Sequence, residues 1–124
     1  CPDPWALAEF YRGLLGWELE AGSDDDWVQL RSDEGATMAF QRVPDHRPPA
    51  WPEGEPPQQA HVDLETDDID AAEAQVIAAG ARKSDFQPEP RYFRVFLDPA
   101  GHPFCLVRTL EQRREIAARE RETA

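Results

Sequence analysis

The chain has 124 residues, of which 40% are hydrophobic and four are tryptophan. This length and composition predict one compact domain with a hydrophobic core, and they exclude both a disordered chain and two independent domains. The net charge of −12 comes from 25 acidic and 13 basic residues. Such a surface repels nucleic acid and anionic lipid, so we expect neither as a partner.

The cysteine content and the lack of long apolar segments point to one cellular setting. Cys1 and Cys105 form no CxxC motif and no disulfide framework. No apolar run approaches the roughly 20 residues that a membrane-spanning helix needs, and no signal segment is visible. We therefore predict a cytoplasmic protein with reduced thiols.

Residues 3–16 (DPWALAEFYRGLLG) predict the first helix. Leu7, Phe10 and Leu14 recur at helical spacing. Pro4 suits the first turn, and Gly16 suits a left-handed stop. Strand-like runs follow at residues 17–20, 27–31 and 36–42.

A connector rich in proline follows at residues 44–59 and contains Trp51. It is too short and too stiff to separate independent domains. We expect an ordered crossover at the rim of the fold.

The second half of the chain repeats the plan of the first. A strand at residues 60–66 precedes a helix at residues 67–80, and strands at 81–85, 93–97 and 104–108 follow. The interval from Asp3 to Gly16 equals that from Asp67 to Gly80, which indicates an internal repeat. The corresponding leading strand of the first half would precede Cys1, and we expect it to lie upstream of this sequence.

The run from Leu110 is rich in arginine, glutamate and alanine, and it predicts a solvated C-terminal helix. The chain thus divides into module one (1–43), the connector (44–59), module two (60–108) and this helix (109–124), all within one domain.

Three segments together carry a family likeness: residues 3–17 (DPWALAEFYRGLLGW), 57–64 (PQQAHVDL) and 98–107 (DPAGHPFCLV). They resemble the glyoxalase/bleomycin-resistance/dioxygenase (vicinal oxygen chelate) superfamily, in particular its single-domain, glyoxalase-like bacterial members. The resemblance implies an α+β fold in which two βαβββ modules form a curled mixed sheet around a central cavity, usually in a homodimer. Chemistry in this superfamily is varied, so the fold alone does not settle the function.

The resemblance also implies where a metal would bind. Catalytic members hold a divalent metal with His and Glu from the first and last strands of each module. His61 stands at one such position, Cys105 replaces the expected Glu, and Ala39 occupies the equivalent position in module one. Because Ala39 offers no donor atom, we predict no catalytic metal and no cofactor. If a metal binds, His61 is its ligand, and with Cys105 it would suit a softer ion such as zinc only with further ligands.

Alternating positions on the strands predict which side chains face the cavity. If His61 and Asp63 point inward, Val62 and Leu64 pack beneath the second helix. By the same alternation, Val28, Leu30 and Phe40 pack beneath the first helix. The predicted ligand-binding residues are His61, Asp63, Trp27, Gln29, Gln41, Trp51, Phe93 and Cys105. Large aromatic groups around a few polar ones suit a planar organic ligand.

Each of these residues also has a purely structural interpretation. His61 could be satisfied by Asp63, Trp51 could anchor its loop, and Cys105 among apolar neighbours is typical of inert core. We expect His102 and Asp98 to brace the turn before the last strand.

The sequence as a whole predicts a metal-free protein that sequesters or carries an amphipathic aromatic compound, with no catalytic residue. An acidic interior would favour a cationic compound. One alternative is a metal-dependent lyase, isomerase or dioxygenase of the same superfamily. Another is a non-catalytic interaction module with a filled interior.

Overall fold

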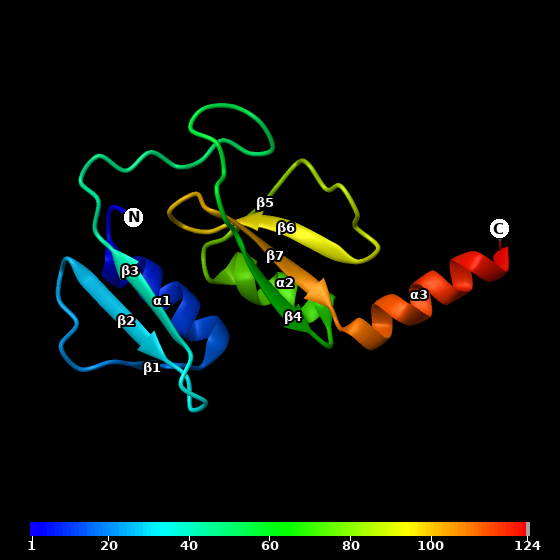
Figure 1. The fold of residues 1–124 in the computed structure, drawn as a ribbon, viewed down its shortest axis with the longest axis horizontal. Coiled ribbons are helices and arrows are strands. Elements are labelled where there is room, and N and C mark those ends of the chain that lie inside the picture. The colour runs from blue at the N-terminus through cyan, green and yellow to red at the C-terminus, as the bar shows by residue number, and fades with distance from the viewer. Residues whose placement is uncertain (124) are drawn as a thin grey trace.

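The structure, a computed structural model that describes residues 1–123, consists of two modules side by side and a protruding C-terminal helix (Figure 1). Module one contains α1 (Pro4–Leu15), β1 (Glu18–Leu19), β2 (Trp27–Arg31) and β3 (Thr37–Gln41). Its strands form an antiparallel sheet in the order β1-β2-β3.

Module two contains β4 (Val62–Thr66), α2 (Ile69–Ala78), β5 (Arg82–Lys83), β6 (Phe93–Leu97) and β7 (Pro103–Arg108). The sheet order is β4-β7-β6-β5, in which β4 runs parallel to β7 and the other pairs are antiparallel. The helix α3 (Leu110–Thr123) follows almost directly. The predicted α+β class is confirmed. The strands are divided between two sheets, and they close no barrel within residues 1–123.

Both module helices begin at an aspartate that caps the first turn. Asp3 Oδ1 accepts from the Ala6 amide at 3.2 Å, and Asp68 Oδ1 accepts from the Ala71 amide at 3.1 Å. Each cap satisfies a backbone N–H that has no partner within its helix. Gly16 ends α1 in the left-handed conformation, with φ of 69°, as predicted.

The outer edge of β3 carries one backbone partner, Cys1. The Cys1 ammonium donates to the Gln41 carbonyl at 2.9 Å, and the Val43 amide donates to the Cys1 carbonyl at 2.8 Å. This is a parallel pairing, and Thr66 at the end of β4 pairs with Arg108 in the same way. The predicted leading strand of module one lies outside the described residues.

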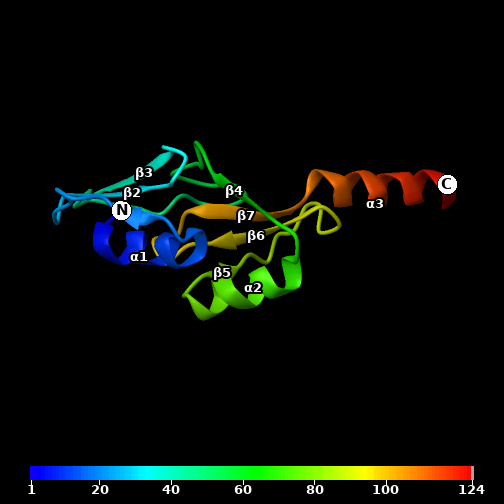
Figure 2. The same ribbon diagram turned by 90° about the horizontal axis from the view of Figure 1, so that it is seen from below.

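The helices α1 and α2 lie on the same side of the two sheets, and the opposite sheet faces are open (Figure 2). The core fills the space between helices and sheets. It is built from buried apolar residues of both modules, which include Leu7, Phe10, Val28, Leu30, Phe40, Ile69, Val76, Phe96, Phe104 and Leu106. Val28, Leu30 and Phe40 are buried beneath α1, on the helix side of the first sheet, as predicted.

Aromatic rings join the two modules. Phe104 of β7 packs edge-on against Phe10 of α1, with ring centroids 5.7 Å apart, and it stacks on Phe96 at the same separation. On the other side, Tyr11 stacks on Phe40 at 5.6 Å. The helix α1 therefore contributes to a core that both sheets share.

One buried carboxylate lies at this junction. Asp98 is only 5% exposed, and its Oδ2 accepts from the Tyr11 hydroxyl at 2.8 Å. Its Oδ1 accepts from the backbone amides of Ala100 and His102 at 2.9 and 3.0 Å and lies 3.3 Å from His102 Nδ1. Asp98 and His102 thus brace the turn as predicted, and Asp98 also ties that turn to α1.

The environment of Asp98 keeps it charged. Burial alone raises its pKa, but hydrogen bonds from His102, the His102 charge and the Tyr11 hydroxyl outweigh burial, so the pKa lies below its ordinary value of 3.8. A lowered folded pKa stabilises the fold above that ordinary value, and this contribution is lost as the pH falls toward the folded pKa. Burial, followed by the charge and hydrogen bond of Asp98, raises the pKa of Tyr11, which therefore remains a donor.

The connector lies against the turn of module two. A ring nitrogen of His46 is 3.0 Å from the Ala100 carbonyl oxygen. Pro48 packs so closely over Gly101 that a Cβ there would lie 2.5 Å from the proline. Among residues 1–123, no helix combines the length and apolarity needed to cross a bilayer.

Replacing Tyr11 with Phe tests the junction. We expect the free energy of unfolding to fall by about 2 kcal/mol, because a buried carboxylate loses a donor. Tyr92→Phe is the matched control, since the Tyr92 hydroxyl donates to Glu120 on the partly exposed α3, and it should destabilise the protein much less. Denaturant unfolding at neutral pH measures both, and equal losses would contradict the assignment.

Candidate functional site

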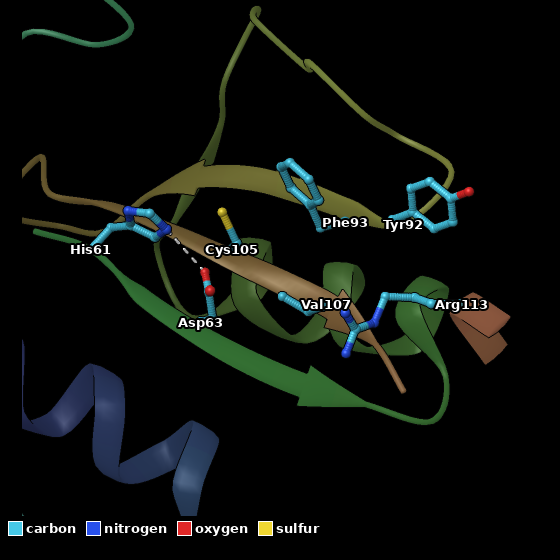
Figure 3. Close-up of a pocket in the computed structure, with 7 residues that line it drawn as sticks. All are labelled: His61, Asp63, Tyr92, Phe93, Cys105, Val107 and Arg113. Carbon is cyan, nitrogen blue, oxygen red and sulfur yellow. Dashed lines mark ion pairs between the residues drawn. The ribbon is translucent and has the colours of Figure 1, made fainter. Parts of the chain in front are cut away.

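A pocket of about 500 Å³ opens on the uncovered face of the second sheet (Figure 3). It is lined by His61, Asp63, Tyr92, Phe93, Cys105, Val107 and Arg113. Strand geometry explains this grouping. Asp63 of β4 lies opposite Cys105 of β7, and Phe93 of β6 lies opposite Val107. Since side chains two residues apart share a face, His61, Asp63, Cys105 and Val107 project into one space.

One end of the pocket is polar. His61 Nε2 lies 3.2 Å from Asp63 Oδ1, and the two side chains are 38% and 60% exposed. The ligand atoms of His61, Asp63 and Cys105 all lie within 4.8 Å of one another. This end can offer hydrogen bonds to a ligand and, with its carboxylate, can accept a donor or a cation.

The thiol of Cys105 is held in its neutral form. Burial raises the pKa of Cys105 to about 12, and the charge and hydrogen bond of Asp63 contribute to the same shift. A thiol attacks only as the thiolate, so Cys105 is no nucleophile near neutral pH. Its side chain forms a small, uncharged part of the pocket floor.

The middle of the pocket is apolar, and its far end is cationic. Phe93 and Val107 lie between the His61–Asp63 pair and Arg113, which comes from the first turn of α3 (Figure 3). Arg113 Nε donates to the Arg108 carbonyl at 3.1 Å. An apolar wall between two polar ends can hold an amphipathic molecule in a fixed direction.

Four of the eight predicted ligand-binding residues meet in this pocket: His61, Asp63, Phe93 and Cys105. Trp27, Gln29 and Gln41 lie on the first sheet, where Trp27 Nε1 donates to Gln29 Oε1 at 3.0 Å. Trp51 lines a separate hollow near Phe86, with ring centroids 6.3 Å apart. A binding role for Trp27, Gln29, Gln41 and Trp51 stays a prediction, as it does for the four residues in the pocket.

The two groups are separated because the sheets are not continuous. No strand pair joins β3 to β4 in residues 1–123. A smaller hollow of about 250 Å³ lies between the modules, with Ala39, His61 and Asp98 among its lining residues. Trp27, Gln29 and Gln41 of the first sheet therefore do not line the same pocket as His61 and Asp63 of the second module.

Sequence reasoning missed Arg113 as a pocket residue, because it assigned the arginines after Leu110 to a solvated helix. Only one residue, Thr109, separates β7 from α3. This short connection keeps the first turn of the helix beside the end of the strand, and it is the signal that could have placed Arg113 at the pocket.

The donor set does not fit the divalent metal site expected for catalytic relatives. That site needs His and carboxylate ligands from both modules, whereas Ala39 contributes no donor from module one. His61, Asp63 and Cys105 form the group within residues 1–123 that could hold an ion. Imidazole, carboxylate and thiolate together suit zinc, and binding would first have to remove the thiol proton.

The sequence itself decides the family. Residues 1–107 match the profile of the family described as the glyoxalase-like domain. The chain belongs to this family. No curated protein matches it.

Solved structures share the fold of this glyoxalase-like chain at low identity. A glyoxalase/bleomycin resistance protein/dioxygenase family enzyme from Burkholderia phytofirmans PsJN is 18% identical, with a TM-score of 0.66 over 89% of this chain and 93% of that one. A glyoxalase/bleomycin resistance protein from Albidiferax ferrireducens T118 is 20% identical, with a TM-score of 0.59 over 86% and 90%. A lactoylglutathione lyase from Agrobacterium tumefaciens is 20% identical, with a TM-score of 0.58 over 87% of each chain. These likenesses show the fold.

The state of Cys105 can be tested by alkylation in a Cys1→Ser background, where Cys105 is the single thiol. Because its pKa is about 12 and it is 5% exposed, we expect iodoacetamide to react at pH 8 about a hundred-fold more slowly than with a small free thiol. Asp63→Asn should speed the reaction, since it removes the nearby negative charge. A rate equal to that of the free thiol would show that Cys105 is activated.

Proposed function

We propose that this glyoxalase-like protein binds and holds a small amphipathic aromatic compound in the pocket of the second sheet, without a catalytic metal. The observation that carries the proposal is the arrangement of that pocket. An apolar wall of Phe93 and Val107 adjoins the polar pair His61 and Asp63. A planar ring packs well on such a wall, while the polar pair sets its orientation.

The chemistry of the pocket favours binding over catalysis. The best nucleophile by residue type, Cys105, is held neutral. His61 is paired with Asp63 at one end of the pocket, where the two side chains can orient a bound ligand by hydrogen bonds. We assign no catalytic residue.

A metal-dependent enzyme is the second candidate, because His61, Asp63 and Cys105 bring three donor atoms within 4.8 Å. In that case a lyase, isomerase or dioxygenase reaction would use an ion at this end of the pocket. The third alternative, an interaction module, predicted a filled interior. It has less support, since a pocket of about 500 Å³ is open.

We propose the cytoplasm as the setting, where the free thiols Cys1 and Cys105 would stay reduced.

We also propose a homodimer, whose second copy would cover part of the open sheet faces, where Trp27 is 47% exposed. Light scattering should then give twice the mass of one chain, and Trp27→Glu should shift the equilibrium toward the monomer. A monomer at all accessible concentrations would contradict the dimer.

Fluorescence of N-phenyl-1-naphthylamine, a neutral and planar probe, tests the binding function. We expect the protein to bind it and Phe93→Ala to weaken binding about ten-fold, because the apolar wall is lost. Phe86→Ala is the control, since the Phe86 ring is 46% exposed and lies in a different hollow. It should leave the affinity unchanged.

Metal chelation and thermal melting separate the two candidate functions. EDTA should not alter probe binding, and divalent ions should not stabilise the protein against heat. If zinc alone raises the melting temperature and His61→Ala abolishes that rise, the metal-dependent candidate replaces the binding proposal.

A further inference from the structure

Arg113 is a cation without an anionic partner at the edge of the pocket. Its Nε bonds to the Arg108 carbonyl, and within residues 1–123 no carboxylate forms an ion pair with its guanidinium. Two other arginines of module two, Arg91 and Arg94, each pair with two carboxylates instead: Arg91 with Glu89 and Glu120, and Arg94 with Asp70 and Glu73. In a chain so rich in acidic residues, Arg113 keeps its remaining N–H donors available to the pocket.

The position of Arg113 is fixed by contacts at both ends of α3. Gln112 Nε2 donates to the Asp67 carbonyl at 2.7 Å, which holds the first turn against module two. Near the other end, Glu120 accepts from the Tyr92 hydroxyl at 3.1 Å. Arg113 is half-buried, whereas the adjacent Arg114 is exposed and faces a different groove, with Leu110 and Glu115. A guanidinium held in this way loses little freedom when it binds an anion.

The two ends of the pocket favour different groups on a ligand. At one end, Asp63 is paired with His61 at 3.2 Å, and its carboxylate can accept a hydrogen bond from a donor group of the ligand. Arg113 lies at the other end, beyond Phe93 and Val107 (Figure 3). A planar, apolar molecule that spans the pocket therefore meets a guanidinium at one end, and a carboxylate or sulfonate matches it best.

We propose that the ligand of this pocket is an aromatic anion, with its ring against Phe93 and Val107 and its acidic group on Arg113. This inference rests on the proposed function and names the class of ligand. It reverses the expectation of a cationic ligand, which the net charge of the chain suggested. The overall charge of −12 repels anions, so selectivity for an anion has to come from a local cation.

A pair of probes with the same ring system tests the proposal. 8-Anilino-1-naphthalenesulfonate carries a sulfonate, and N-phenyl-1-naphthylamine is its neutral counterpart. In fluorescence titrations at low salt, we expect the native protein to bind the sulfonate about ten-fold more tightly than the neutral probe. Arg113→Gln should remove this preference and leave the affinity for the neutral probe within about two-fold. Arg113→Lys should restore part of it.

Arg114→Gln is the matched control, because it removes the same charge from the next position of the same helix. It should leave both affinities unchanged. Circular dichroism should show that all three variants keep the helix content of the native protein.

The outcomes separate the two proposals. If the native protein binds both probes equally, or the neutral one better, the anionic ligand is ruled out and the binding function stands. An equal loss of sulfonate binding in Arg114→Gln would also overturn the inference, because the effect would then be that of net charge. If neither probe binds, the proposed function fails and the inference fails with it.

Discussion

The buried contact between Tyr11 and Asp98 is the constraint on which the arrangement of the two modules depends. Asp98 closes the turn that leads into β7, so its hydrogen bonds determine where that strand begins. The same turn sets the register in which Leu97 pairs with Pro103 and Val95 with Cys105. Because side chains alternate along a strand, this register directs Cys105 and Val107 toward the pocket. A contact at the module junction therefore shapes a site on the opposite face of the sheet.

The pocket has polar groups at its two ends and uncharged side chains between them. Cys105 lies next to the His61–Asp63 pair, and burial together with Asp63 suppresses its ionisation. Val107 lies two positions further along β7, opposite Phe93 of β6, and both line the adjoining part of the pocket. Such a floor favours contact with a ring and avoids covalent reaction with it. The polar groups at the two ends can orient a bound molecule, as the proposed binding function requires.

Local sequence signals predicted most elements of the fold, and tertiary placement limited the prediction of the site. Asp3 and Gly16 marked the ends of α1 because capping and left-handed stops are local in origin. Alternation placed Val28, Leu30 and Phe40 in the core for the same reason. Alternation also gave the correct face for His61, but it carries no information about which sheet a strand joins. How helices and strands pack on one another determines that Trp27 lies away from the pocket and that Arg113 lines it.

The distribution of aromatic residues has a consequence for spectroscopy. None of the four tryptophans, at positions 5, 17, 27 and 51, lines the pocket. Intrinsic emission therefore reports on module one and on the connector, and an occupied pocket would change it only through energy transfer to an absorbing ligand. Tyr92 and Phe93 are the aromatic side chains at the site. Near-ultraviolet absorbance and proton resonances of these two rings are the natural reporters of occupancy.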